Sequence, residues 1–127
     1  VNMGEIRALG ALPDGTPWRV GIADPRKPWR PLTTLPLRER AIATSGGYGT
    51  VFDAAGRHHH LFEPGSGRSA HHYHSVSVIA DDATTADALS TALSLLAPAA
   101  ARDLLTAYPR VHALFVSKHR PGSSFAL

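Results

Sequence analysis

The sequence of 127 residues contains no cysteine. Disulfide bonds, thiolate metal sites and a cysteine nucleophile are therefore excluded. Lysine is also scarce, with two residues against eleven arginines, and the 13 basic and 10 acidic side chains are scattered along the chain. Because no basic stripe is interleaved with aromatic residues, the sequence does not predict nucleic-acid binding. No apolar run reaches the length of a membrane span.

The remaining composition, 43% hydrophobic and 18% charged, predicts one globular domain with a core. Extended patterns predict strands over residues 1–9, 18–22, 32–37, 40–44, 48–52, 57–62, 74–80 and 111–117. Helices are expected over 81–97 and about 99–107, and a proline-rich loop over 24–31. The first two strands are expected to form a hairpin. This order predicts an α+β fold, in which both helices pack on one face of an antiparallel sheet.

The helical pattern over 81–97 is the longest in the chain, because apolar residues recur at i, i+3 and i+4 without an intervening Gly or Pro. Thr84 or Thr85 is expected to cap its start. Asp87 and Thr91 are four residues apart and therefore lie on the same helix face. They can offer two hard oxygens to Mg²⁺ or Ca²⁺. Alternatively, Thr84 and Asp87 form a capping box and have only a structural role.

Eight histidines are present, and His58, His59 and His60 are consecutive. Imidazole suits Zn²⁺, Ni²⁺ and Cu²⁺, so a transition-metal site is one interpretation. On a strand, however, His58 and His60 face one side and His59 the other, whereas a zinc site needs three or four converging ligands. We therefore expect most of the histidines to be solvent-facing strand residues.

Two short segments are suited to contact a ligand. His60 ends a predicted strand, and the turn-forming sequence 63–67 follows it, so its imidazole can act as a general base near neutral pH. An ordinary hairpin end is the alternative that the local residues leave open. The hydroxyls and glycines over 44–47 interrupt the strand pattern and allow a close approach of the backbone to a ligand. A further hairpin turn is expected over 53–56.

Six segments, in this order and spacing, resemble the C-terminal half of the ApbE family, the FAD:protein FMN transferases. They are NMGEIRALG from Asn2, WRVGIADP from Trp18, ATSGGY from Ala43, HLFEPGSG from His60, SVSVIA from Ser75 and TADALSTAL from Thr85. The resemblance extends to about Tyr108. It implies that residues 1–127 form the C-terminal part of a single ApbE-like domain, whose N-terminal half lies outside this chain.

The resemblance implies an enzyme that splits FAD at its pyrophosphate, moves FMN onto a Thr or Ser hydroxyl of a target flavoprotein and releases AMP. It implies Asp87 and Thr91 as Mg²⁺ ligands and His60 as the catalytic base, whereas His58 and His59 match no functional position. The residues expected to line the flavin and phosphate pocket are Thr44, Ser45, Gly46, His60, Leu61, Glu63, Pro64 and Gly67.

The chain departs from the family pattern in two residues. Glu63 stands where the family usually has Asp, and Gly47 stands where an acidic residue usually follows ATSG. The family's N-terminal half also supplies much of the FAD-binding surface and a backbone ligand to the metal. Two further functions therefore stay open: a non-catalytic module that binds flavin or a partner, and a Mg²⁺-dependent FAD pyrophosphatase that yields FMN and AMP.

The partners implied by the resemblance are FAD, a target flavoprotein that carries the acceptor Thr or Ser, and the N-terminal half or the chain that contains it. An extracytoplasmic location, periplasmic or membrane-anchored, is expected from the resemblance alone.

Overall fold

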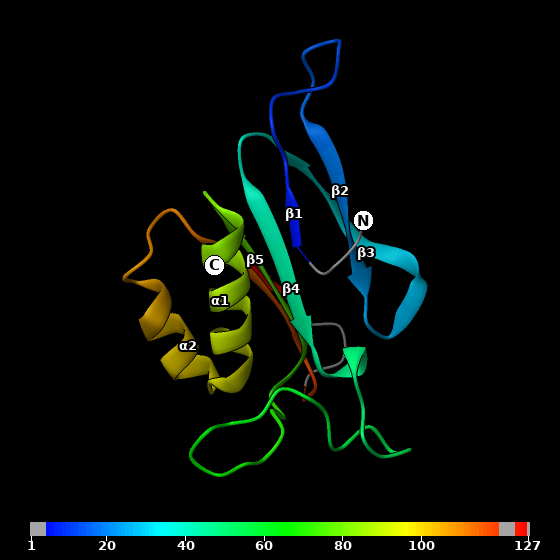
Figure 1. Cartoon of the computed structure of the whole chain (residues 1–127), viewed down its shortest axis with the longest axis vertical. Helices are drawn as coiled ribbons and strands as arrows, with labels where there is room; N and C mark the ends of the chain where they lie inside the picture. Colours follow the sequence, from blue (N-terminus) through cyan, green and yellow to red (C-terminus); the bar gives the residue numbers. More distant parts are fainter. Residues whose placement is uncertain (1–4, 120–123, 127) are drawn as a thin grey trace.

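A five-stranded antiparallel sheet is the centre of the computed structural model, which describes residues 5–119 and 124–126 (Figure 1). In spatial order, its strands are β1 (Glu5–Arg7), β4 (Ala41–Gly46), β5 (Tyr73–Ala80), β6 (His112–Ser117) and β7 (Ser124–Ala126). Helices α1 (Ala83–Leu95) and α2 (Pro98–Leu105) both pack on one face of this sheet. The predicted α+β architecture is confirmed. The predicted strand over 1–9 lies partly outside the described residues.

The main core lies between the sheet and the two helices. In β5, Val76, Val78 and Ala80 alternate with Ser75, Ser77 and Ile79, and the first three are fully buried on the helix side, as the period-two pattern predicts. Leu89 and Leu93 of α1 pack against them. This packing buries the apolar stripe of α1, the main source of stability for a helix of 13 residues. No helix among the described residues is long and apolar enough to cross a membrane.

A two-stranded antiparallel ribbon covers part of the other face of the sheet. It consists of β2 (Trp18–Asp24) and β3 (Lys27–Leu37), and its apolar residues form a second, smaller core with Ala8 and Ile42. The predicted hairpin between the first two strands is therefore wrong. β1 instead pairs with β4, because the chain after β1 turns away and forms β2 with its partner β3.

The predicted proline-rich loop over 24–31 is also wrong in most of its length. Pro25 lies in the turn, but Pro28 and Pro31 lie within β3. Proline lacks the backbone N–H, but in a two-stranded ribbon each strand has one unpaired edge where that donor is not needed. Register shifts on both sides of Ala23 bend the ribbon at the same place.

Residues 50–72 form a long excursion at one end of the sheet (Figure 1). The predicted strands over 48–52 and 57–62 are wrong. A short 3₁₀ helix, η1 (Gly47–Gly49), follows β4, and the rest of the segment has only two isolated bridges, Val51 with His59 and Phe62 with Ser69. The predicted turn over 53–56 is present, with Gly56 at a φ of 64°.

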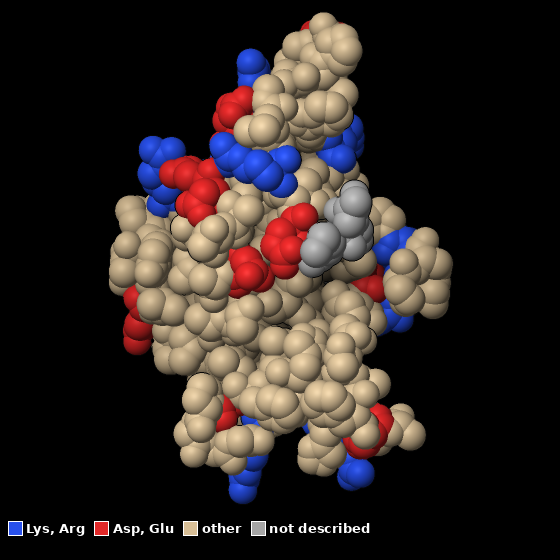
Figure 2. Space-filling model, in the orientation of Figure 1, with Lys and Arg blue, Asp and Glu red and all other residues tan. Residues whose placement is uncertain are grey.

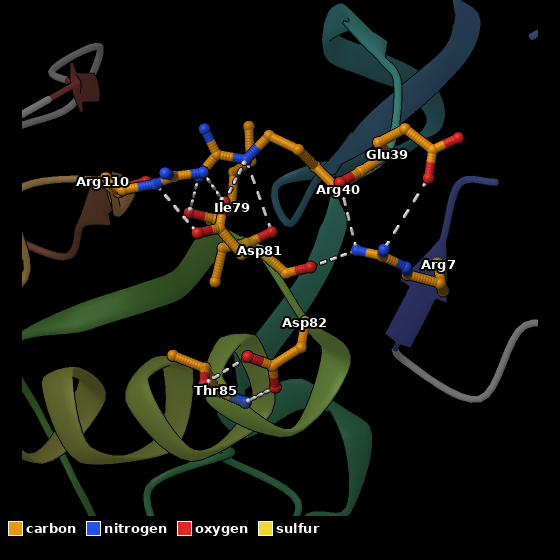
Figure 3. Close-up of polar contacts among 9 residues, drawn as sticks. Arg7, Glu39, Arg40, Ile79, Asp81, Asp82, Thr85 and Arg110 are labelled. Carbon is orange, nitrogen blue, oxygen red and sulfur yellow. Dashed lines mark hydrogen bonds and ion pairs between the residues drawn. The ribbon is translucent and has the colours of Figure 1, made fainter. Parts of the chain in front are cut away.

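Three arginines hold the start of α1 against the sheet through Asp81 (Figure 3). Arg110 Nε lies 2.9 Å from the Asp81 carboxylate, Arg40 Nε lies 3.7 Å from it, and Arg7 donates a hydrogen bond to the Asp81 carbonyl. These groups come from β1 and from the residues that precede β4 and β6. Figure 2 shows basic and acidic side chains side by side at the upper end of the molecule. Exposed ion pairs contribute little to stability individually, so these contacts mainly position Asp81, just before α1, against the sheet.

Asp82 is the N-cap of α1. Its Oδ1 accepts the Thr85 backbone N–H at 2.8 Å, and its Oδ2 accepts the Thr85 hydroxyl at 2.7 Å. The expectation that Thr84 or Thr85 is the cap is wrong, because a carboxylate two residues upstream takes the role. Asp87 is the fifth residue of the helix, so the alternative capping box of Thr84 and Asp87 does not form.

We predict that Asp82→Ala lowers the free energy of unfolding more than Thr84→Ala does. The first change removes the acceptor of two hydrogen bonds at the helix start, whereas Thr84 is an exposed residue within the first turn. Urea unfolding followed by circular dichroism measures both. An equal or larger effect of Thr84→Ala would show that the cap is placed wrongly.

Candidate functional site

The Ser45 hydroxyl joins the end of β4 to the middle of α1. Ser45 Oγ lies 2.7 Å from Ser90 Oγ and 3.1 Å from Thr91 Oγ1, although 45 and 46 residues separate them in sequence. Ser90 in turn donates to the Asp87 carbonyl at 3.0 Å. The tertiary structure therefore brings the Thr-Ser-Gly segment and the helix with the Asp/Thr pair together.

The direction of these hydrogen bonds follows from one proton per hydroxyl. Ser90 gives its proton to the Asp87 carbonyl, so Ser45 must donate to Ser90, and Thr91 must donate to Ser45. Thr91 Oγ1 is then a donor within the protein, and its lone pairs are available to a cation.

The predicted metal ligands lie one helical turn apart on α1. The Asp87 side chain is exposed, Thr91 is half-buried, and no salt bridge of the described residues includes the Asp87 carboxylate. A carboxylate and a hydroxyl are hard oxygen ligands of the kind that Mg²⁺ takes, so the pair fits this metal in donor type. Across residues 5–119, no group of three His, Cys, Asp or Glu side chains is placed to hold a metal ion. Further ligands would have to be hydroxyls, carbonyls, water or substrate oxygens.

Thr44 points to the opposite face of the sheet from Ser45, as neighbours on a strand do. Its hydroxyl lies 2.8 Å from Ser77 Oγ, and with Tyr48 it lines a cavity of about 300 Å³ beneath the β2–β3 ribbon. Ser75, paired in register with Gly46, has a buried hydroxyl without a hydrogen-bond partner among the described residues.

Gly46 has no side chain for a steric reason. A Cβ at this position would lie 2.4 Å from Cε1 of Tyr48, whose ring packs over the end of β4. The expected interruption of the strand over 44–47 is thus placed too early: Thr44, Ser45 and Gly46 complete β4, and the chain turns only in η1.

His60 is exposed and is held by one backbone carbonyl. Its Nδ1 lies 3.3 Å from the Thr50 carbonyl oxygen, and its backbone N–H donates to the same oxygen at 3.1 Å. Because a carbonyl can only accept, Nδ1 carries the proton in this contact and Nε2 has the free lone pair. An imidazole oriented in this way can accept a proton at Nε2.

The loop after His60 is a closed turn rather than an open strand end. Gly67 N–H donates to the Glu63 carbonyl at 2.8 Å, Glu63 N–H donates to Arg68 at 2.8 Å, and the Ser66 hydroxyl donates to the Glu63 carboxylate. Pro64 and Gly67 are exposed, with Gly67 at a φ of 65°. Glu63 is thus engaged within its own turn.

Leu61 differs from the other predicted pocket residues because it is buried. Its carbonyl accepts the Ala70 N–H at 2.9 Å, which fixes the excursion to the chain just before β5. A second cavity of about 550 Å³, mostly apolar, lies under the ribbon. Neither cavity is lined by His60, Asp87 or Thr91.

His59 is a site-proximal residue that sequence reasoning placed among the solvent-facing histidines, and that expectation is wrong for it. The side chain is only 2% exposed, whereas His58 and His60 are exposed, so the predicted alternation itself is present. Its Nε2 donates to the Ala70 carbonyl at 2.8 Å. Burial lowers the pKa of His59, and the Ala70 carbonyl partly offsets this effect. The sequence could predict that His59 faces the opposite side from His58 and His60. It could not predict that this side is buried, because that depends on the residues packed around His59.

Two more imidazoles have a lowered pKa. Burial lowers the pKa of His72, and the nearby His71 and His119 add to the effect; burial also lowers the pKa of His74, next to Lys118. The rings of His71 and His72 are 4.1 Å apart between centroids. His72 and His74 therefore stay neutral in the folded protein at pH values where an unfolded imidazole is already charged.

The comparisons with known proteins concern the family and the fold of the chain. The model of the ApbE family matches residues 1–115. A protein of Treponema pallidum named FAD:protein FMN transferase is 37% identical over 119 residues, which is 91% of this chain and 32% of that protein. A protein of the same name from Rhodobacter capsulatus is 40% identical over 92 residues, 71% of this chain and 17% of that protein.

Solved structures give the same result for the fold. The crystal structure of the ApbE protein of Thermotoga maritima has a TM-score of 0.83 at 37% identity, covering 96% of this chain and 40% of that one. The flavin transferase ApbE of Vibrio cholerae has a TM-score of 0.76 at 29% identity, covering 98% of this chain and 40% of that one. The chain spans about a third of the length of the Treponema relative, less than the half that the resemblance implies.

We predict that the free energy of unfolding falls as the pH is lowered from about 7.5 to about 5.5, and that His59→Gln reduces this fall. A folded pKa below the unfolded value near 6.5 means that the unfolded chain binds the proton first. The stabilisation is fully present above pH 6.5 and is lost as the pH falls towards the folded pKa. Urea unfolding at several pH values measures the slope.

His58→Gln is the matched control, because His58 is an exposed neighbour. Its slope should be steeper than that of His59→Gln, because it keeps the buried imidazole at position 59 while His72 and His74 contribute equally to both variants. Equal slopes for His59→Gln and His58→Gln would contradict the neutral, buried state of His59.

Proposed function

We propose, from the premise that the chain belongs to the ApbE family, that it carries part of the active site of an FAD:protein FMN transferase. The reaction moves FMN from FAD to a Thr or Ser hydroxyl of a target flavoprotein and releases AMP. The observation that carries the proposal is the hydroxyl chain from Thr91 through Ser45 to Ser90, which places the Thr-Ser-Gly segment on the helix with Asp87.

Asp87 and Thr91 would hold Mg²⁺ when it is bound, and the ion would neutralise charge on the FAD pyrophosphate. The chain's own contribution is to keep both oxygens available. Asp87 has no basic partner among the described residues, and Thr91 directs its proton to Ser45. Two oxygens are fewer than Mg²⁺ requires, so water, FAD phosphates and backbone outside this chain complete the set.

His60 is the base of the proposed transfer. The acceptor hydroxyl oxygen forms a bond to the FMN phosphorus, the bridging P–O bond breaks, and AMP leaves with the bridging oxygen. The hydroxyl proton passes to Nε2 of His60, while the Thr50 carbonyl holds the proton on Nδ1. An exposed ring suits this role because the acceptor belongs to another protein and must reach it from solvent.

One further partner is proposed from the part of the relatives that the chain does not cover. Because the chain spans about a third of the Treponema relative, we propose that the N-terminal region of the family type, in the same or another chain, supplies the rest of the FAD-binding surface. We also propose an extracytoplasmic location, periplasmic or membrane-anchored, from the resemblance to the family. Fractionation of cells tests this location, and recovery of the protein with cytoplasmic markers would contradict it.

We predict that His60→Ala lowers the rate of FMN transfer by about 10²–10⁴-fold, the usual contribution of a positioned general base. The full-length protein is incubated with FAD, Mg²⁺ and a target flavoprotein, and covalent flavin is measured by fluorescence and mass. His58→Ala is the control, since His58 is also exposed and lies two residues from His60. An unchanged rate in His60→Ala would eliminate this residue as the base.

The same assay separates the proposal from its alternatives. Covalent flavin on the target supports the transferase. Release of FMN and AMP without labelling of any target would indicate an FAD pyrophosphatase instead. If neither occurs but calorimetry detects tight FAD binding by the 127-residue chain, the non-catalytic binding module is correct and the transferase proposal is wrong.

We predict that Asp87→Asn raises the Mg²⁺ concentration for half-maximal transfer by roughly tenfold or more, because a neutral amide replaces the charged ligand. Calorimetric titration with Mg²⁺ in the presence of FAD gives an independent measurement. Asp103→Asn, an exposed carboxylate on α2, is the matched control and should leave the Mg²⁺ dependence unchanged. A shift of similar size in both variants would contradict the assignment of Asp87 as a Mg²⁺ ligand.

A further inference from the structure

The ring of His59 occupies the space directly above Gly47. A Cβ built on Gly47 would lie 2.5 Å from Cδ2 of His59, 2.6 Å from Nε2 and 2.8 Å from Cγ. Such distances are far below any real carbon contact, so no side chain fits at position 47 while the ring is in place. Gly47 is not among the described glycines with positive φ. Its backbone conformation therefore suits any residue, and the atoms nearest to a Cβ here all belong to the ring of His59.

The ring cannot easily move aside. It is 2% exposed, its Nε2 donates to the Ala70 carbonyl at 2.8 Å, and its Nδ1 accepts the Leu61 N–H at 3.4 Å. The backbone of the same residue is held as well: its N–H donates to Ser69 Oγ at 2.9 Å, and the Ser69 hydroxyl donates back to its carbonyl at 2.9 Å. His59 thus connects η1, the His60 segment and the residues that lead into β5.

The next residue, His60, packs against the same short helix. A Cβ on Gly49 would lie 3.4 Å from Cε1 of His60, and the Thr50 carbonyl holds Nδ1 of His60. The two imidazoles are 6.4 Å apart between centroids. η1 therefore touches one ring at its first residue and the other at its last, and it follows directly after Gly46 of β4.

We propose that His59 is a positioning residue, and that the pair of His59 and Gly47 sets where His60 lies relative to the Thr44–Gly46 end of β4. The catalytic consequence rests on the function proposed above, whereas the packing of the pair does not. The pair also bears on Gly47 as a departure from the family pattern. An acidic residue at position 47, usual in the family pattern, would have to begin with the Cβ that His59 excludes.

A double-mutant cycle on the 127-residue chain tests the pair without any assay of transfer. The variants are Gly47→Ala, His59→Ser and their combination, with urea unfolding as the measurement. Gly47→Ala alone should lower the folding equilibrium constant by roughly tenfold or more, because the new methyl group meets a fixed ring. In the His59→Ser background, Gly47→Ala should lower the folding equilibrium constant by less than roughly threefold, because the ring is absent.

Gly65→Ala is the matched control, because a Cβ there meets nothing within 4 Å and no positive φ is involved. Its cost should be small and the same in both backgrounds. Equal costs of Gly47→Ala with and without His59 would overturn the proposal. If Gly47→Ala does not fold, folding of the double variant supports the pair, and failure of both contradicts it.

A second measurement tests positioning itself. Amide and imidazole NMR signals of Thr44–Gly46 and His60 should shift in His59→Ser and return towards their original values in His59→Gln, whose amide can still donate to the Ala70 carbonyl. His58→Ser should leave them unchanged. Unchanged His60 signals in His59→Ser would refute a positioning role.

The transfer assay then relates the pair to the reaction. His59→Ser should reduce the transfer rate of the full-length protein with little change in the KM for FAD, and His59→Gln should restore part of it. Lost transfer with unshifted His60 signals would contradict the proposal. A positive cycle in a protein without any transfer would leave the pair intact and reject only the proposed function.

Discussion

The close packing of α1 against β4 and β5 is the constraint on which the rest of the structure depends. The residues at this contact are small: Ala41, Ala43 and Ala86 are almost completely buried, and Ser45 and Ser90 continue the same rows. Small side chains let the helix lie close enough to the strand for two hydroxyls to meet at 2.7 Å. A larger residue in these rows would push the helix outward and separate the hydroxyls, because protein cores adjust poorly to added volume. The stability of the core and the geometry of the site therefore arise from the same contact.

The end of β4 serves two faces of the sheet at once. Ser45 faces the helix and the proposed metal ligands, whereas Thr44 faces the cavity beneath the β2–β3 ribbon together with Tyr48. Strand alternation thus divides a short motif between a polar helix contact and a cavity on the opposite face of the sheet. The segment of residues 50–72 then adds His60 at the same end of the sheet, held there through His59 and η1.

Sequence patterns predicted best where one interaction dominates. β5 and α1 follow directly from their periods, because Val76, Val78 and Ala80 of β5 and the apolar stripe of α1 pack against each other in the main core. The prediction failed where partners are distant. The local sequence does not determine that β2 pairs with β3 rather than with β1. The prolines over 24–31 are typical of a loop, but they are tolerated in β3 because each strand of the ribbon has an unpaired outer edge. The 57–62 segment has a strand-like composition but no neighbouring strand to pair with, so it forms isolated bridges. For the same reason the burial of His59 was missed while its alternation with His58 and His60 was correct.

By itself, the sequence determined which functional groups the chain can use. It contains no thiol, places Asp87 and Thr91 on one helix face, has hydroxyls at Thr44 and Ser45, and has an imidazole before a tight turn. These are consequences of residue type and of helix or strand period, which act over a few residues. Only the tertiary structure decided which of them meet. The contact of Ser45 with Thr91 spans 46 residues, and the contact of Gly47 with His59 depends on a steric fit that no local pattern encodes. Contacts of this kind depend on the whole packed core, so they are not visible until the chain is folded.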